Sequence, residues 1–143
     1  MNTLSYATET LVFQSQVGKL YYQPGGYVRL AWAAERLSFD LIQAYYEQAL
    51  VLLANTGVRR ILSDHGQRAP LPAAAQEWIT TNWIPRAMSL ARTQHCAIVE
   101  GVDPVHRLSI QSVVSNAPTG FQFRRFDQFS AADAWLRGLV LAA

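Results

Sequence analysis

Apolar and polar residues alternate along the first part of the chain, a period-two pattern that is typical of β-strands with one buried face. The predicted strands cover residues 10–14, 19–23 and 27–33. One face of the third strand carries Val28, Leu30 and Trp32. The turn signal Pro24-Gly25-Gly26 lies between the second and third strands, so we predict that these two form an antiparallel hairpin.

From residue 38 onward the apolar period lengthens to that of α-helices. Ser38 can cap the first helix through its hydroxyl, and Gly57 supplies the left-handed residue that ends it. A second helix begins near Ala73. Pro85 lies inside this helical pattern and predicts a kink or a break near Ile84, because proline has no N–H to donate.

Two further helical patterns cover residues 105–115 and a segment near the C-terminus, where we expect Ser130 as the N-cap with Asp133 in a capping-box-like position. Strand patterns alternate with the helices, at residues 58–63, 94–100 and 121–126. Such alternation implies right-handed crossovers. We therefore predict a single α/β domain over residues 1–143, with a mostly parallel sheet, an N-terminal antiparallel hairpin and about four helices.

Composition excludes several classes of protein. Half of the 143 residues are apolar and 15% are charged, as in globular domains, and the net charge of +2 without a basic stripe argues against nucleic-acid binding. No apolar run is long enough to span a membrane, and no secretory signal opens the chain, so we expect a cytoplasmic protein. Cys96 is the only cysteine, which excludes an internal disulfide.

With these elements placed, the chain resembles the SpoIIAA-like group of STAS domains, and in particular the short stand-alone bacterial members. The segments that carry the resemblance are Leu30-Ala31-Trp32, the helix capped by Ser38, Ile61-Leu62-Ser63-Asp64, Glu77-Trp78, Ala97-Ile98-Val99, Phe126 and Ala134-Trp135-Leu136. The resemblance implies a SpoIIAA-like fold and a non-enzymatic regulatory or protein-interaction module like an anti-sigma-factor antagonist. In outline such domains are also similar to Sec14-type lipid-binding domains.

One departure from the family pattern bears on regulation. Antagonists that are regulated by phosphorylation resemble Asp-Ser-Ser-Gly after the central strand, whereas this chain has Asp64-His65-Gly66 there. The acceptor serine is missing, so the resemblance does not imply the usual phosphoserine switch at this loop, although Ser63 precedes it.

Two loops are expected to meet at the carboxyl ends of the parallel strands, where ligands bind in open α/β sheets. Each loop contains an acid, a histidine and an arginine: Asp64, His65 and Arg68 in one, Asp103, His106 and Arg107 in the other. One interpretation is a cleft for a small anion. The alternatives are that the aspartates cap turns or helices while the arginines form surface pairs, or that the histidines act as acid–base groups or bind a metal.

Tryptophan side chains make the proline-containing helix unusually apolar. Trp78 and Trp83 are either core residues or part of a lipophilic pocket or partner-binding patch. No nucleotide-binding glycine pattern, metal-binding motif or nucleophile with a base at defined spacing is present, so we expect no cofactor, no metal and no enzymatic activity.

We therefore expect a non-enzymatic STAS-like module that binds a partner protein or itself as a homodimer. The alternative is a domain that binds a small anionic or lipophilic molecule in a pocket between the kinked helix and the sheet.

Overall fold

The computed structural model describes residues 9–34, 36–66 and 68–139. In this part of the chain a six-stranded sheet runs in the order β1-β2-β3-β4-β5-β6. Its strands are β1 (Thr10–Gln14), β2 (Gly18–Tyr22), β3 (Val28–Trp32), β4 (Arg60–Asp64), β5 (His95–Val99) and β6 (Gln122–Phe126). The first three strands pair antiparallel, and β3 through β6 pair parallel.

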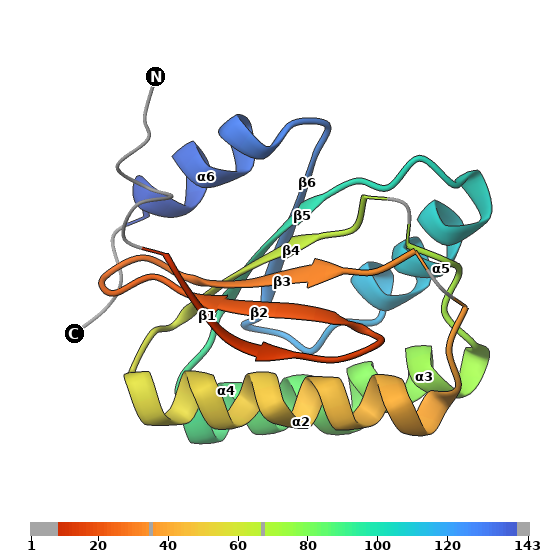
Figure 1. Cartoon of the computed structure of the whole chain (residues 1–143), viewed down its shortest axis with the longest axis horizontal. Helices are drawn as coiled ribbons and strands as arrows, with labels where there is room; N and C mark the ends of the chain where they lie inside the picture. Colours follow the sequence, from red (N-terminus) through yellow and green to blue (C-terminus); the bar gives the residue numbers. More distant parts are fainter. Residues whose placement is uncertain (1–8, 35, 67, 140–143) are drawn as a thin grey trace.

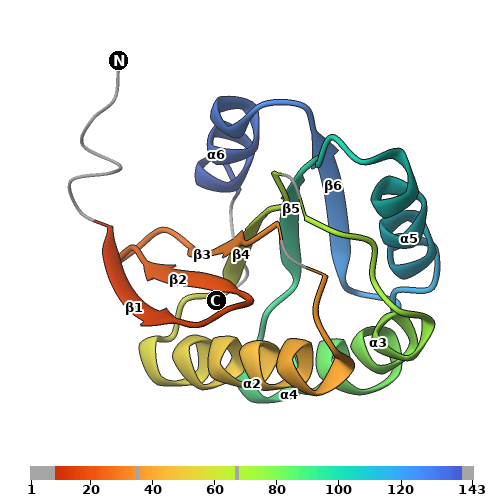
Figure 2. The same ribbon diagram turned by 45° about the vertical axis from the view of Figure 1, so that its right-hand side comes forward.

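Helices cover both faces of the sheet (Figure 1). They are α2 (Phe39–Thr56), α3 (Ala73–Trp78), the π-helical turn η1 (Ile79–Trp83), α4 (Ile84–Ala91), α5 (Pro104–Ser115) and α6 (Phe129–Arg137). Helices α2 and α4 lie together on one face and α6 lies on the other, while α5 stands beside β6, as Figure 2 shows. No helix in the described segments is long and apolar enough to cross a bilayer.

The predicted α/β class and the mostly parallel sheet are confirmed. The predicted hairpin is part of a three-stranded antiparallel meander, and its turn is closed by the Gly26 N–H, which donates to the Gln23 carbonyl at 3.0 Å. Ser38 accepts from the Leu41 N–H at 3.5 Å, and Gly57 has φ 74°, so both predicted ends of α2 are confirmed.

The irregularity predicted around Pro85 is also confirmed, but it takes a form that the sequence does not specify. The chain continues from α3 to α4 without stopping and passes through the wider π-helical turn η1, in which the Ile84 N–H donates to the Ile79 carbonyl five residues earlier. Pro85 is the second residue of α4, directly after the π-helical turn, so the helical hydrogen-bond pattern widens just before the residue that has no N–H to donate.

The predicted start of the last helix is wrong. Helix α6 begins at Phe129 with Gln128 as its N-cap, so Ser130 lies inside the first turn. Asp133 does not close a capping box; it accepts a hydrogen bond from the Tyr27 hydroxyl at 2.6 Å and pairs with Arg137 at 2.9 Å. The Asp133 carboxylate, which we expected to cap the helix, is instead hydrogen-bonded to Tyr27, the residue directly before β3.

The sheet separates two apolar clusters. The larger one lies between the sheet and helices α2, η1, α4 and α5, and it includes Leu30, Leu53, Trp83 and Ile110. The smaller one lies under α6, around Leu136. Because β-strand side chains alternate between faces, odd-numbered residues of β4 point to the larger cluster and Leu62 to the smaller.

Gly18 is the position where this sheet tolerates no side chain. A Cβ there would overlap the carbonyl oxygen of Ala31 on β3. We expect Gly18→Ala to lower the free energy of unfolding by roughly 2–4 kcal/mol in chemical denaturation, because backbone must move to relieve the overlap. Gly57→Ala is the matched control: its Cβ meets open space, so only the left-handed φ opposes it, at about 1–2 kcal/mol. Equal losses in the two variants would contradict this account.

Candidate functional site

The loops that follow β4 and β5 meet at the carboxyl end of the parallel strands. The His65 N–H donates to the Val99 carbonyl at 3.0 Å, and the Val102 N–H donates to the Gly66 carbonyl at 3.0 Å. Gly101 permits this approach, because a Cβ there would lie 2.9 Å from the Gly66 oxygen. The predicted meeting of these loops is therefore present, and it brings His65 against α5.

A line of buried side chains crosses this meeting point. The Trp32 Nε1–H donates to the Ser63 hydroxyl at 2.9 Å, Ser63 Oγ lies 3.0 Å from His65 Nε2, and His65 Nδ1 lies 3.1 Å from His106 Nε2. The His65 and His106 side chains are 2% and 0% exposed. Strands β3 and β4, the following loop and α5 are thus joined by one hydrogen-bonded line.

The Arg68 side chain lies beside this hydrogen-bonded line and is only 3% exposed. Its Nη1 lies 3.3 Å from His65 Nε2, and its guanidinium stacks 3.3 Å from the centre of the Trp32 ring. No carboxylate in the described segments forms an ion pair with Arg68, and its Nη2 has no hydrogen-bond partner there. Arg68 is therefore a buried cation whose charge is not balanced by a described acid.

Arginine can only donate, and this fixes the protons of both histidines. His65 Nε2 must accept from Arg68, so a neutral His65 carries its proton on Nδ1. That proton is donated to His106 Nε2, which leaves the His106 proton on Nδ1. Ser63 accepts from Trp32 and donates its hydroxyl hydrogen to His65 Nε2, so the single lone pair of this nitrogen is shared between Ser63 and Arg68.

Burial keeps both imidazoles neutral. It lowers the pKa of His65 well below its usual value, with a further contribution from the Arg68 charge. It also lowers the pKa of His106 to about 4, again with help from Arg68. The cation at Arg68 and these two neutral rings therefore form an electrically positive patch inside the protein.

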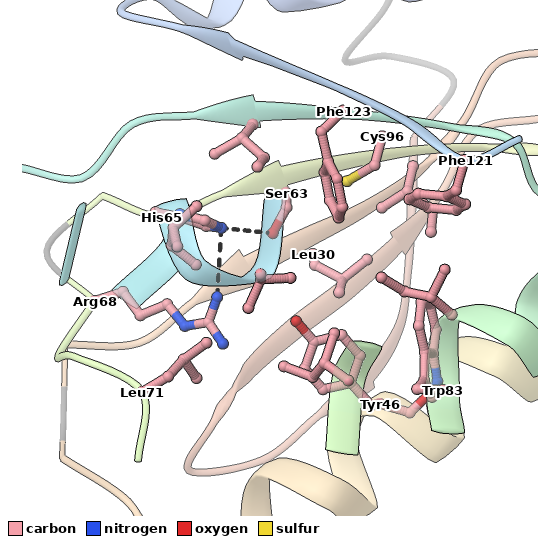
Figure 3. A pocket seen from close by; sticks show the side chains of 16 residues that line it. Leu30, Tyr46, Ser63, His65, Arg68, Leu71, Trp83, Cys96, Phe121 and Phe123 are labelled. Atoms are coloured by element: carbon pink, nitrogen blue, oxygen red, sulfur yellow. Dashed lines mark hydrogen bonds between the residues drawn. The ribbon is translucent and has the colours of Figure 1, made fainter. Parts of the chain in front are cut away.

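The Arg68 guanidinium points into an apolar cavity between the sheet and helices α2, η1, α4 and α5 (Figure 3). The centre of a water-sized molecule can occupy about 40 Å³ of it, which is room for roughly three waters. Tyr46, Trp83, Cys96 and Ile110 are among the lining residues, and Ser63, His65 and Arg68 form the polar end.

The candidate residues from the sequence divide into two groups. His65, Arg68, His106 and Trp83 lie at or beside the cavity, and the Trp83 indole N–H donates to the Tyr46 carbonyl at 2.7 Å. Trp78 is half-buried and packs edge-on against Tyr46 without lining the cavity.

The other three predicted residues do not join the site. Asp64 lies on the opposite face of β4 from Ser63, since strand side chains alternate. Asp103 is the N-cap of α5, where it accepts from the Val105 N–H at 2.9 Å. Arg107 is half-exposed and lies 3.9 Å from Glu100. The capping and surface-pair interpretation is thus correct for Asp103 and Arg107, whereas Arg68 is buried.

Sequence reasoning missed the contribution of Ser63, Trp32 and Tyr46 to this site. The available signal was Ser63 itself, a hydroxyl at an inward-facing position of an otherwise apolar strand, two residues before His65. No group of three or more histidine, cysteine, aspartate or glutamate side chains in the described segments is arranged to hold a metal ion.

No family model, curated protein or solved structure matches this chain.

The neutral histidine pair predicts a loss of stability in acid. In the unfolded chain a histidine binds a proton near pH 6.5, whereas folded His106 binds one only near pH 4. The unfolded state therefore gains protons first as the pH falls, and the free energy of unfolding should drop by roughly 3 kcal/mol between pH 7 and pH 4. Denaturant titrations across this range measure it.

His106→Gln is the control for this pH dependence, because its amide oxygen can still accept from His65 while the group no longer titrates. Its stability should fall less steeply over the same range. His65 and His95 also have lowered pKa values, so the variant should still lose stability in acid, while the raised pKa of Asp64 opposes part of this loss. Identical slopes in the wild type and the variant would show that His106 is not held neutral.

Proposed function

We propose that this protein is a non-enzymatic binding domain that encloses a small, largely apolar molecule in the cavity between the sheet and the kinked helix. The observation that carries this proposal is the internal cavity with apolar walls and one polar end, at which Arg68 has an unpartnered N–H. Ligand sites in proteins combine these features: mostly hydrophobic walls and a few placed polar groups.

The lining of this cavity differs from that of a dry packing defect. Protein interiors are filled to the density of organic crystals, and dry internal cavities are apolar throughout. Here a guanidinium, an imidazole and a hydroxyl gather at one wall, while the remaining lining is dominated by residues such as Leu30, Ile98 and Phe121. A guest molecule with an apolar body and one polar end matches both parts.

Catalysis is the weaker assignment, although Ser63 and His65 lie at the distance of a nucleophile and its base. Arg68 donates to the same His65 nitrogen that would have to take the serine proton, and its charge opposes protonation of the ring. The Ser63 hydroxyl oxygen, which would be the nucleophile, already accepts a hydrogen bond from the Trp32 indole N–H. Burial raises the pKa of Cys96 to about 12, so this residue stays a thiol.

A SpoIIAA-like, STAS-type identity belongs to the same proposal. What supports it is the element order, three antiparallel N-terminal strands followed by crossovers to parallel strands, together with the segments that resemble the family. The cavity favours a non-enzymatic module of that type, with an interior pocket similar to that of Sec14-type domains.

Filling the cavity should abolish binding. Cys96 lines it, so Cys96→Met places a longer side chain in the empty space, whereas Cys96→Ala enlarges that space. We expect 1-butanol to shift the methyl NMR resonances of the cavity residues Ile61, Ile98 and Ile110 in the wild type and in Cys96→Ala. The same titration of Cys96→Met should leave them unshifted.

The methyl groups of exposed Val51 serve as an internal control, because nonspecific solvent effects would move them as well. Native mass spectrometry of protein purified without detergent is the complementary measurement, with a co-bound species expected. Equal responses in Cys96→Met and Cys96→Ala would place any binding outside the cavity and end the proposal.

Binding to a protein, including a second copy of this chain, is a second candidate function. It is favoured by three exposed apolar side chains at the start of α5: Val102, Val105 and Leu108, which are 74%, 60% and 71% exposed. Val105 and Leu108 are three residues apart on the helix and therefore adjacent on its surface. The surface around residues 73–89 is a poorer candidate, because Ile79, Trp83 and Ile84 of that segment are buried.

If this patch forms a homodimer, Leu108→Glu should weaken self-association at least tenfold, because a charge would be buried in an apolar contact. Sedimentation equilibrium at several protein concentrations measures the effect. Leu90→Glu, at a residue of similar exposure on α4, should leave association unchanged. A wild-type protein that stays monomeric at all concentrations would remove the homodimer.

A further inference from the structure

A buried positive charge needs a partner, and Arg68 has none among the described acids. Guanidinium groups stay protonated at all physiological pH values. Burial lowers the pKa of Arg68, which means that the folded environment disfavours its charge. Its stacking on Trp32, its contact with His65 and a hydrogen-bonding contribution from the neutral Tyr46 hydroxyl relieve part of that cost, but Nη2 has no acceptor in good hydrogen-bond geometry within the described segments.

The other ionisable groups around the cavity do not supply a negative charge. Tyr46 points toward the guanidinium (Figure 3), but burial raises its pKa, so it is a neutral phenol. Cys96 is a neutral thiol for the same reason. Arg125, another cation, acts on His65 and so adds to the positive potential.

The acids nearby are engaged elsewhere. Glu100 accepts from Arg125 at 2.5 Å, and Asp103 caps α5. Asp64 lies on the far face of β4 and interacts with Arg29. No described acid therefore balances the charge of Arg68, and an anionic group of a bound molecule could do so.

We infer that the occupant of the cavity is a short-chain carboxylate, whose oxygens accept from Arg68 Nη2 while its hydrocarbon tail lies against the apolar walls. This inference rests on the proposed binding function and names its ligand class. A monoanion matches one guanidinium flanked by two neutral imidazoles, whereas a phosphate brings up to two charges and more oxygens than these donors can satisfy. A planar carboxylate also suits the planar guanidinium.

The size of the cavity limits the tail. Space for roughly three waters, about 90 Å³ of liquid volume, limits the ligand to a carboxylate with a tail of a few carbons. A second, smaller hollow shares Arg68 and Leu71 with the first; Val17, Trp32 and Leu37 also line this hollow. Arg68 thus lies between two hollows.

The experiment compares butyrate with the neutral, similarly shaped butyramide and 1-butanol at pH 7, following the methyl resonances of Ile61, Ile98 and Ile110. Butyrate should bind at least about tenfold more tightly than either neutral compound, as expected for a charge-assisted hydrogen bond in a buried site. Arg68→Met should remove this preference, so that butyrate binds no more tightly than 1-butanol in this variant. Arg68→Lys keeps the charge and should retain part of the preference.

Thermal unfolding without ligand gives an independent readout. Because the empty site holds an uncompensated charge, Arg68→Met should unfold at a temperature equal to or higher than the wild type, as when buried ionic groups are replaced by apolar ones. A merely structural Arg68 would give a lower unfolding temperature in this variant. That result would overturn the inference even if the methyl titrations with Arg68→Met were compromised by poor folding.

The outcomes separate the inference from the function on which it rests. If butyrate and 1-butanol bind the wild type equally, the cavity binds ligands but not through Arg68, and only the inference fails. If neither shifts the cavity methyl groups, both fail. Inorganic phosphate that binds more tightly than butyrate would replace the carboxylate by a different anion and so contradict the ligand class named here.

Discussion

The site depends on the direction of one hydrogen-bonded line, which is set by a group that can only donate. Arg68 donates to His65 Nε2, and this places the remaining protons on Nδ1 of His65 and then on Nδ1 of His106. The line also ties β3 and β4 to α5 through Trp32 and Ser63. Fold and site are therefore coupled: the crossover connections bring the loops together, and the buried polar line holds their ends in register.

The π-helical turn η1 shapes the apolar end of the cavity. The wide turn carries Trp83 inward, where its indole N–H finds the Tyr46 carbonyl on α2. π-Helical turns within α-helices occur frequently at functional sites, because they re-aim side chains without ending the helix. In this protein the turn gives one wall of the cavity, and Pro85, which has no N–H to donate, follows it directly in α4.

Local rules predicted most of the fold and part of the site. Capping by Ser38, termination at Gly57 and an irregularity near Pro85 each depend on one residue and its neighbours, and sequence is sufficient for these, although not for the π-helical form of the irregularity. Ser130 lies inside α6, which begins at Phe129, and the Asp133 carboxylate binds Tyr27, more than a hundred residues away, which no local rule could predict. The meeting of His65 and His106 followed from topology, but the burial of Arg68 did not, because arginine in a loop is ordinarily a surface residue.

The proposed carboxylate would give the buried Arg68 the counter-ion that no described acid supplies. A desolvated guanidinium costs stability when it is unpaired, and an anion that binds only the folded protein offsets that cost by mass action. The occupancy of the cavity and the free energy of unfolding would then be linked through Arg68. Burial and the Arg68 charge hold His65 neutral, so the site carries a single positive charge, which one monoanion can balance.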